Sequence, residues 1–284
     1  MTTQSIPPPP PSSRTSLLPA PLPEASSKEK LFGRMTSFLE QLGEIAILSR
    51  GAFTSLWKRP FEVPATIYQI ESLGVRSMGI VAVTSVFIGM VMTIQFAYGL
   101  RKFGGVEYIP RVIVLSFLRE LGPTLTAVIV GGRIGSGMAA EVGAMNVTEQ
   151  VDAIRALGGD PVKKLVLPRV AAAMIVMPLL SMFADTLGTL GAIFVCSFEF
   201  GISPRLFMLS SLEVIRMGDL FTGLMKTPIF GFIIAIVGCH FGLTTKGGTE
   251  GVGKSTTRSV VVISISILIA DFFLTRIAWA IGGD

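Results

Sequence analysis

The sequence predicts an all-α polytopic membrane protein with five transmembrane helices. An N-terminal interfacial amphipathic helix is expected before them, and a short cytoplasmic helix between the second and third spans. Half of the 284 residues are hydrophobic and 15% are charged, whereas a soluble domain carries about 25% charged residues. The mean hydropathy is +0.66. Five stretches also supply the roughly 20 apolar residues that a helix needs to cross a hydrocarbon core.

Residues 1–27 are rich in Pro and Ser, include five consecutive prolines, and lack the apolar core of a signal peptide. We expect a disordered cytoplasmic tail there. Residues 28–76 are expected to form an amphipathic helix and a lead-in to the first span. Apolar residues alternate with charges over residues 28–57, as in a helix that lies in the cytoplasmic interface. A soluble helical hairpin is the alternative. The apolar positions are Leu31, Met35, Phe38, Leu42, Ile45, Phe53 and Leu56.

Residues 77–284 are expected to form one domain with five spans, at 77–100, 112–132, 170–198, 227–245 and 259–281. The third span is long enough to tilt or to bend at Pro178. Placing the N-terminus in the cytoplasm puts most Lys and Arg residues in cytoplasmic loops. This bias predicts a cytoplasmic N-terminus and a periplasmic C-terminus.

The net charge of +5 does not indicate nucleic-acid binding, because the basic residues are scattered between apolar runs. Cys196 and Cys239 lie in apolar stretches without ligand spacing, and His240 is the single histidine. We therefore expect no metal site and no cofactor in this chain.

Residues 248–255 match the P-loop pattern G-x-x-x-x-G-K-[ST]. A working P-loop joins a buried strand to a helix within an α/β domain. This match lies between two predicted spans, with no strand–helix alternation around it. We interpret it as a Gly-rich turn followed by Lys254 and Arg258, and we expect no ATPase activity and no catalytic residue in this chain.

Small residues are dense from the end of the second span onward, which predicts close helix–helix approach there. They are Gly131, Gly132, Gly135, Gly137, Ala139, Ala140 and Gly143.

A short helix is predicted next, because Asn146 with Glu149 resembles a helix start and Gly158 with Pro161 a helix stop. Its apolar residues share one face, and they are Val147, Val151, Ile154 and Leu157. Such a helix can lie on lipid or insert into a groove of a partner. Residues 141–155 hold three acidic residues, Glu141, Glu149 and Asp152, against Arg155 alone. This acidic excess favours docking to a protein over an anionic membrane surface.

Four charged residues fall in the middle to outer part of the predicted bilayer, and such residues usually face a partner or a cavity. They are Arg119, Glu120, Asp185 and Asp271. Arg119 could pair with Asp185 or Asp271 and hold the helices together. Alternatively, the four could form a polar patch in an outward-opening lipid cavity, where Arg119 meets a phosphate. Val86, Met90 and Ile94 are a candidate wall for lipid tails, although helix packing explains them equally well.

Two long motifs carry a family resemblance: ELGPTLTAVIVGGRIGSGMAAEVGAMNVTEQVDAIRALGGDP, and GLTTKGGTEGVGKSTTRSVV before the last span. They resemble MlaE/YrbE-type permeases, the membrane subunits of ABC transporters that move lipids with MCE-domain proteins. The similarity covers about residues 31–282. The Pro-rich first 27 residues depart from the family's short N-terminus.

The resemblance implies a homodimer in a bacterial inner membrane that maintains outer-membrane lipid asymmetry. Each copy would dock a separate ATPase subunit, which binds ATP and Mg, through a coupling helix at residues 146–157. A phospholipid substrate and an MCE-domain lipid-binding protein follow from it, with a STAS-domain subunit as a further candidate. The rival hypothesis is an ion-coupled secondary transporter with Asp185 and Asp271 as proton sites. The lack of an internal repeat opposes it.

Overall fold

The computed structural model describes residues 27–56 and 62–282, and these residues contain helices but no strand. The expected tail lies outside the described residues, apart from Ser27, where α1 (Ser27–Leu56) begins. The chain divides into two units, with a boundary after Gly43. The second unit, from Glu44 onward, contains all five candidate spans.

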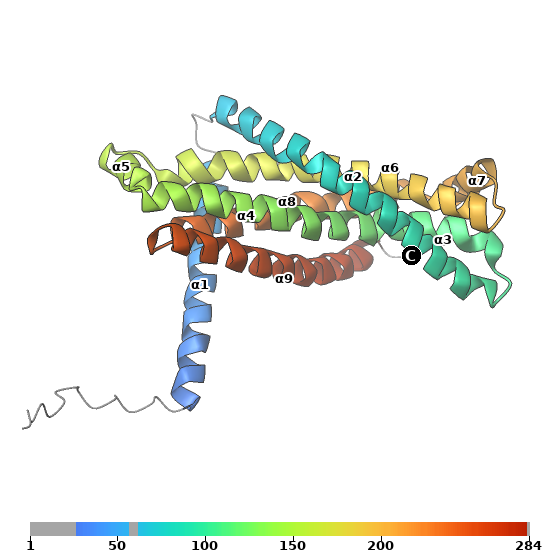
Figure 1. The fold of residues 1–284 in the computed structure, drawn as a ribbon, viewed down its shortest axis with the longest axis horizontal. Coiled ribbons are helices and arrows are strands. Elements are labelled where there is room, and N and C mark those ends of the chain that lie inside the picture. Colours follow the sequence, from blue (N-terminus) through green and yellow to red (C-terminus); the bar gives the residue numbers. More distant parts are fainter. Residues whose placement is uncertain (1–26, 57–61, 283–284) are drawn as a thin grey trace, which may run out of the picture. The chain divides into compact units, whose positions relative to one another are not determined.

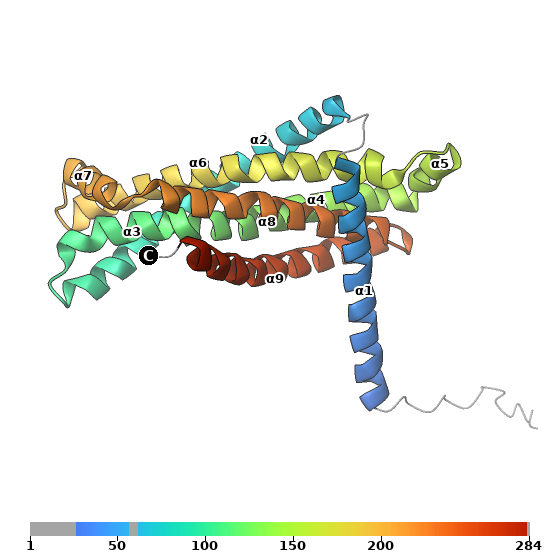
Figure 2. The same ribbon diagram turned by 180° about the vertical axis from the view of Figure 1, so that it is seen from behind.

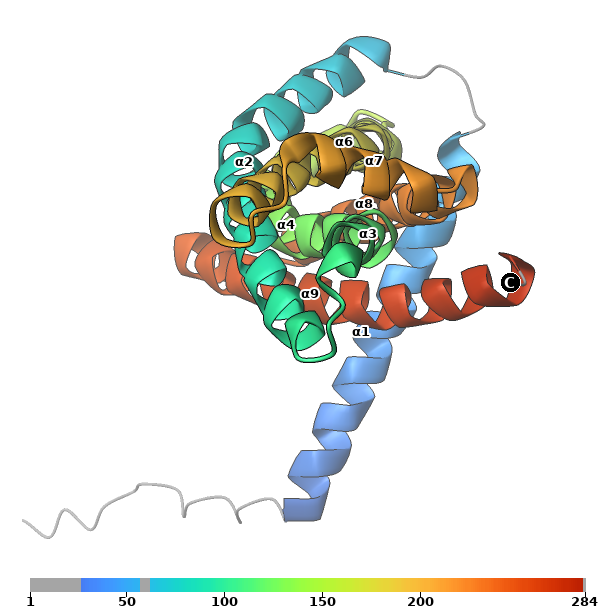
Figure 3. The same ribbon diagram turned by 90° about the vertical axis from the view of Figure 1, so that its right-hand side faces the viewer.

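The helices of this second unit lie side by side as a bundle, with α5 at one end and α7 at the other (Figures 1 and 2). Seen along the bundle, α4 and α8 occupy the middle (Figure 3). The long helices are α2 (Val63–Arg101), α4 (Gly122–Val147), α6 (Leu167–Glu199), α8 (Met217–Leu243) and α9 (Gly248–Gly282). The short elements are η1 (Val106–Tyr108), α3 (Ile109–Ser116), η2 (Phe117–Leu121), α5 (Gln150–Ala156), η3 (Val162–Val166) and α7 (Pro204–Val214).

Each predicted span coincides with one of the five long apolar helical segments, apart from one or two residues at the ends of the fourth and fifth, so the fold class is confirmed. The helices extend further than predicted, however. Helix α2 begins at Val63, within the predicted lead-in, and has a proline in its first turn. Helix α8 begins at Met217 and α9 at Gly248, each about ten residues before the predicted span. An apolar run ends at the first charged residue, whereas the helix itself continues through polar turns until a stop signal such as Gly or Pro.

The expected close packing around the glycines of α4 is confirmed at three positions. A Cβ atom on Gly131 or Gly135 would press on Ile263 of α9, and one on Gly143 would press on Thr245. At Gly137, in contrast, nothing lies within 4 Å of such an atom. These contacts fix α4 against its neighbours α8 and α9.

A second small-residue seam, which sequence analysis missed, joins α2 to α6. From Leu73 onward the buried residues of α2 recur at every fourth position, and they are Leu73, Ser77, Val81, Ser85, Gly89, Thr93 and Ala97. A Cβ atom on Gly89 would collide with the backbone carbonyl of Gly188 in α6. Residues four apart share a helix face, so this stripe lets the two helices approach closely.

The part of α1 within the second unit packs on the bundle. Ala52 is fully buried, and Ile45 and Leu48 pack against the main core. Leu42 and Phe53 are exposed. The side chains of Leu31, Met35 and Phe38 lie outside the described residues, and the interfacial placement of this helix stays a prediction.

Candidate functional site

An ion-pair network at the α7 end of the bundle brings together two of the predicted polar residues. The ammonium group of Lys226, in α8, lies 2.7 Å from the Glu120 carboxylate and 3.1 Å from that of Asp271. It also donates a hydrogen bond to Thr275 at 2.7 Å. Because Lys226 is only 3% exposed, this charge is held almost entirely by protein groups from η2 and α9.

Lys226 was missed by the sequence analysis, which began the fourth span at Thr227 and left Lys226 in the preceding outer loop. In the structure Lys226 lies well inside α8. One signal was present: the predicted spans held three acidic residues, Glu120, Asp185 and Asp271, against two basic ones, Arg119 and Arg276, which left one carboxylate without a basic partner inside the spans.

Arg119 pairs with Asp219, so both partners expected for it, Asp185 and Asp271, are wrong. Its Nε donates to Asp219 Oδ1 at 2.8 Å, and its Nη2 forms an ion pair with the same oxygen. The other Asp219 oxygen accepts a hydrogen bond from the backbone N–H of Arg216 and so caps α8. Asp219 was missed because it lies before the predicted span.

The guanidinium of Arg119 also lies 5.5 Å from the ring centre of Trp279, within the range of a cation–π contact. Arg119 and Glu120 sit in η2, a π-helical turn between α3 and α4. This turn directs Arg119 toward Asp219 and Glu120 toward Lys226. Of the two roles left open by the sequence, these contacts favour helix tethering for Arg119.

Asp185 lies apart from this network and packs against Gly122 at the start of α4. Its Oδ1 is buried and has no hydrogen-bond partner among the described residues. Asp271 pairs with Lys226, whereas no ion pair among the described residues joins Asp185 to this network, so the structure does not assemble the two carboxylates into one polar patch.

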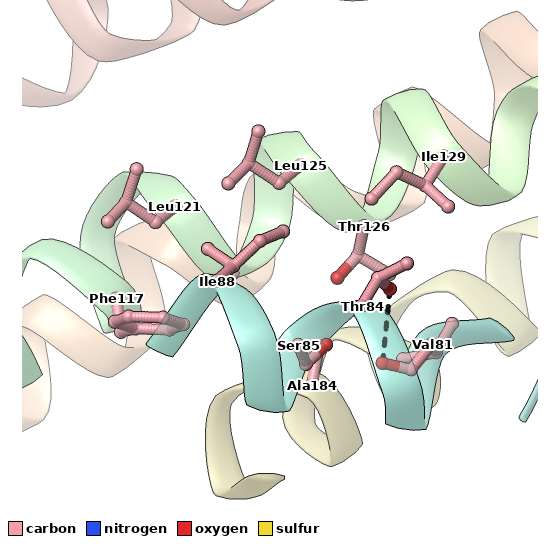
Figure 4. Close-up of a pocket in the computed structure, with 11 residues that line it drawn as sticks. Val81, Thr84, Ser85, Ile88, Phe117, Leu121, Leu125, Thr126, Ile129 and Ala184 are labelled. Atoms are coloured by element: carbon pink, nitrogen blue, oxygen red, sulfur yellow. Dashed lines mark hydrogen bonds between the residues drawn. The ribbon is translucent and has the colours of Figure 1, made fainter. Parts of the chain in front are cut away.

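A groove runs between α2, α4 and α6 (Figure 4). Helix α2 contributes Val81, Thr84, Ser85 and Ile88 to its lining. The predicted tail wall is on other faces of α2. Val86, Met90 and Ile94 are half-buried and do not line the groove. The carbonyl of Val86 faces Gly191 of α6, which is helix packing.

The predicted short helix is present as α5, but its start was wrong. Asn146 and Val147 belong to the last turn of α4. The Asn146 side chain donates to the Thr245 carbonyl at 3.0 Å, which ties the end of α4 to the end of α8. The turn falls at Glu149, whose φ of 61° is left-handed. The predicted stop is confirmed, because Gly158 adopts a φ of 76° directly after the helix.

The apolar residues of this helix do not present a single free face, contrary to the prediction. Val151 is fully buried within the chain, and Ile154 is half-buried against Gly159. Leu157 is 89% exposed. On the polar side, Asp152 pairs with Arg155 at 2.8 Å. Leu157 is therefore the apolar side chain that a partner can cover.

The P-loop match occupies the first turns of α9, where a helix replaces the predicted turn. Gly251 donates its backbone N–H to the Gly247 carbonyl, and its Cα packs on the carbonyl of Lys246. Lys254 forms an exposed ion pair with Glu250 at 2.6 Å. A phosphate-binding loop needs free backbone N–H groups before the helix begins, so this segment is not built to hold a nucleotide.

Five long apolar helices, tied together by buried ion pairs, define a polytopic integral membrane protein. The sequence model described as Permease MlaE matches residues 66–277. A probable ABC transporter permease of Rickettsia typhi is 38% identical over 88% of this chain and 97% of its own length. A probable ABC transporter permease of Synechocystis is 43% identical over 77% of this chain and 83% of its own. The chloroplastic protein TRIGALACTOSYLDIACYLGLYCEROL 1 of Arabidopsis thaliana is 40% identical over 77% and 63%.

The chain belongs to the MlaE permease family. It is a permease of an ABC transporter, that is, a non-catalytic membrane subunit whose ATPase activity lies in a partner.

Proposed function

We propose that this permease moves a phospholipid between a bacterial inner membrane and an MCE-domain partner, as a homodimer. The observation that carries the proposal is the family match over residues 66–277. The lipid cargo is further supported by the Arabidopsis relative, whose name is that of a glycolipid. A STAS-domain subunit is a further candidate partner, and the ATPase subunit supplies the ATP and Mg sites.

The ATPase docks at α5 in this proposal, at the end of the bundle that faces the cytoplasm. Leu157 is almost fully exposed there, and an apolar side chain on a short helix can insert into a groove of a partner. Val151, buried in the chain, fixes α5 to the permease. A push on Leu157 is therefore transferred to the bundle and not absorbed by a loose loop.

In this proposal helix α4 transmits the movement of α5 to the α7 end of the bundle. It is continuous over 26 residues, about 39 Å at 1.5 Å per residue. It begins at the π-helical turn that holds Arg119 and Glu120. A shift of α4 thus acts on the ion pairs with Asp219 and Lys226, which join the three segments η2, α8 and α9. In the proposed cycle these pairs rearrange when the outward cavity opens or closes.

The test is lipid transfer by the reconstituted complex of permease and ATPase in vesicles, with a fluorescent phospholipid and a purified MCE-domain acceptor. We expect transfer to need ATP hydrolysis and to continue when an ionophore removes the proton gradient. Transfer that ignores ATP, stops with the ionophore and is lost in Asp185→Asn would instead favour the secondary transporter. Absence of any lipid movement in the intact complex refutes the proposal.

A further inference from the structure

Helix α8 consists of two parts that are held in the bundle by different forces. From Phe230 to its end, the helix packs through apolar side chains, which belong to the main core. In residues 217–226, which we call the outer segment, no apolar side chain belongs to either core cluster. The buried residues of the outer segment are one glycine and two charged residues, and they are Asp219, Gly223 and Lys226.

The large apolar side chains of the outer segment point away from the bundle. Met217 is 85% exposed, Phe221 65% and Met225 52%. The segment therefore gains little from apolar burial within the chain. Parts of a protein with few buried apolar contacts move apart from the core at a lower free energy than the core itself opens.

Polar contacts hold the outer segment in place. Asp219, near its far end, pairs with Arg119, and Lys226, at its near end, pairs with Glu120 and Asp271. Between these pairs the segment meets η2 through backbone, because Gly223 has no side chain to separate them. The Arg119–Asp219 pair is thus the contact that fixes the far end of the segment.

Pro228 interrupts α8 just after the outer segment. Proline has no N–H, so the carbonyl of Leu224, four residues earlier, loses its helical partner. The Thr227 hydroxyl donates a hydrogen bond to this carbonyl at 2.8 Å, as Ser and Thr side chains do beside prolines in membrane helices. This bond lies entirely before Pro228. It satisfies the carbonyl without joining the two parts of α8, so it does not resist bending between them.

The part of α8 beyond Pro228 is fixed. A Cβ atom on Gly231 would collide with the carbonyl of Ala173 in α6, and one on Gly238 would press on the carbonyl of Gly135 in α4. Such backbone contacts leave this part no room to follow a displacement of the outer segment. Bending is therefore concentrated at Thr227–Pro228.

Helix α6 also contains a proline, Pro178, but its surroundings differ. Beyond Pro178, Gly188 and Gly191 pack directly on the backbone of α2. The outer half of α6 is therefore held by a close helix–helix contact and provides a fixed reference for the outer segment of α8.

We propose that the outer segment of α8 pivots as an intact helix about Thr227–Pro228, and that the Arg119–Asp219 pair is the latch that holds it in the position seen here. The Asp219 side chain is 7% exposed. Once its partner is lost, this carboxylate regains water when the segment swings away from η2, which favours the open position. The assignment of this movement to the opening of the outward cavity rests on the proposed function.

The size of the movement follows from the length of the segment. Phe221 precedes Pro228 by seven residues, which gives a lever of about 10 Å. A change of about 20° in the kink angle, the scale of proline kinks in helices, then displaces Phe221 by about 4 Å.

The test measures this displacement in the full-length permease in lipid nanodiscs, without ATPase or nucleotide. Spin labels are placed on Phe221→Cys and on Leu190→Cys, an exposed position in the fixed part of α6. The native cysteines are buried and should not be labelled. Labelled copies are mixed with an excess of unlabelled permease, so that distances within one copy are read by pulsed electron paramagnetic resonance.

Arg119→Gln should shift the 221–190 distance by about 4 Å. The distance from Ile229→Cys, beyond the pivot, to the same α6 label should stay unchanged. Arg111→Gln is the matched control, because it breaks an exposed ion pair with Glu213 at the same end of the bundle and should shift neither distance.

A second substitution locates the pivot. Pro228→Ala supplies an N–H for the Leu224 carbonyl and makes α8 continuous. Combined with Arg119→Gln, it should remove at least half of the shift, whereas Pro178→Ala should not reduce it. If Arg119→Gln fails to assemble, Arg119→Gln with Asp219→Asn removes both charges of the latch and should give the same shift.

Three results would overturn the proposal. The first is a 221–190 distance that stays the same when the latch is removed. The second is a shift of equal size with and without Pro228→Ala. The third is fast hydrogen exchange of the amides of residues 217–226 in Arg119→Gln, because a segment that pivots as an intact helix keeps its amides protected, whereas one that unfolds does not.

The outcome separates from that of the proposed function, because the distance measurement needs neither the ATPase nor a lipid acceptor. Lipid transfer by a complex whose outer segment does not move in Arg119→Gln refutes this inference alone. A pivoting segment in a complex that transfers no lipid refutes the transport proposal alone.

Discussion

Replacing Lys226 by Met should destabilise the protein strongly, because Lys226 neutralises two carboxylates at once. Its side chain is 3% exposed, while those of Glu120 and Asp271 are 39% and 18% exposed. Removal of one partner from a buried ion pair costs about 3–5 kcal/mol. Water reaches Glu120, so we expect a loss near the lower value, about 3 kcal/mol. Unfolding followed by intrinsic Trp fluorescence in mild detergent measures the change.

A rescue variant separates charge from shape. Lys226→Met combined with Glu120→Gln and Asp271→Asn removes the stranded charges and should regain most of the lost stability, since neutral replacements of buried ion networks are often tolerated. Lys254→Ala is the matched control. It breaks an exposed Lys–Glu pair, which is worth about 0–1 kcal/mol. Equal stability of wild type and Lys226→Met would show that the network does not hold the bundle together.

Three more predictions concern α5, the α2–α6 seam and the P-loop match. Leu157→Asp should detach the ATPase in co-purification while the permease stays folded. The control Val151→Asp, at a buried site, should instead lower the yield of the permease itself. If the ATPase still co-purifies with Leu157→Asp, α5 is not the docking element. Gly89→Ala should lower the free energy of unfolding by about 1–3 kcal/mol, because the added methyl group overpacks against α6. Gly99→Ala should leave it unchanged, since nothing lies within 4 Å of a Cβ atom there. Equal melting temperatures of the two variants would contradict close packing of α2 on α6. Lys254→Ala should leave the nucleotide affinity of the complex unchanged in a binding titration. A loss of affinity would indicate that residues 248–255 bind nucleotide.

The sequence was sufficient for the number of spans and for their apolar cores, because length and hydrophobicity alone decide whether a helix can cross a membrane. It was also sufficient to predict the packing at Gly131, Gly135 and Gly143, since small side chains have few other uses at such density. The helix stop at Gly158 could be read as well, because only a residue without a Cβ atom adopts a positive φ at low cost.

Partner choice was not predictable in the same way. Arg119 had three carboxylates within the predicted spans, and its actual partner, Asp219, lies 100 residues away in a turn that was assigned to a loop. A π-helical turn redirects Arg119 and Glu120, and no residue pattern marks such a turn. The predicted helix start at Asn146 was wrong for a related reason. Asn is a frequent helix cap, but the Asn146 amide donates its hydrogen bond to the Thr245 carbonyl, just after α8.

The π-helical turn is also where movement of α4 has to be taken up. Along its length α4 presses on Ile263 and Thr245 through glycine contacts, so it cannot slide past α8 and α9 without losing them. Packed interfaces of this kind have discrete arrangements and do not deform continuously. The π turn at residues 117–121 departs from the α-helical hydrogen-bond pattern, and such turns are rare and frequently lie at functional sites. If α5 transmits a force along α4, this turn can take up a change of backbone geometry, and it carries Arg119 and Glu120. The ion pairs of these two residues with Asp219 and Lys226 are then the first contacts at the α7 end to respond.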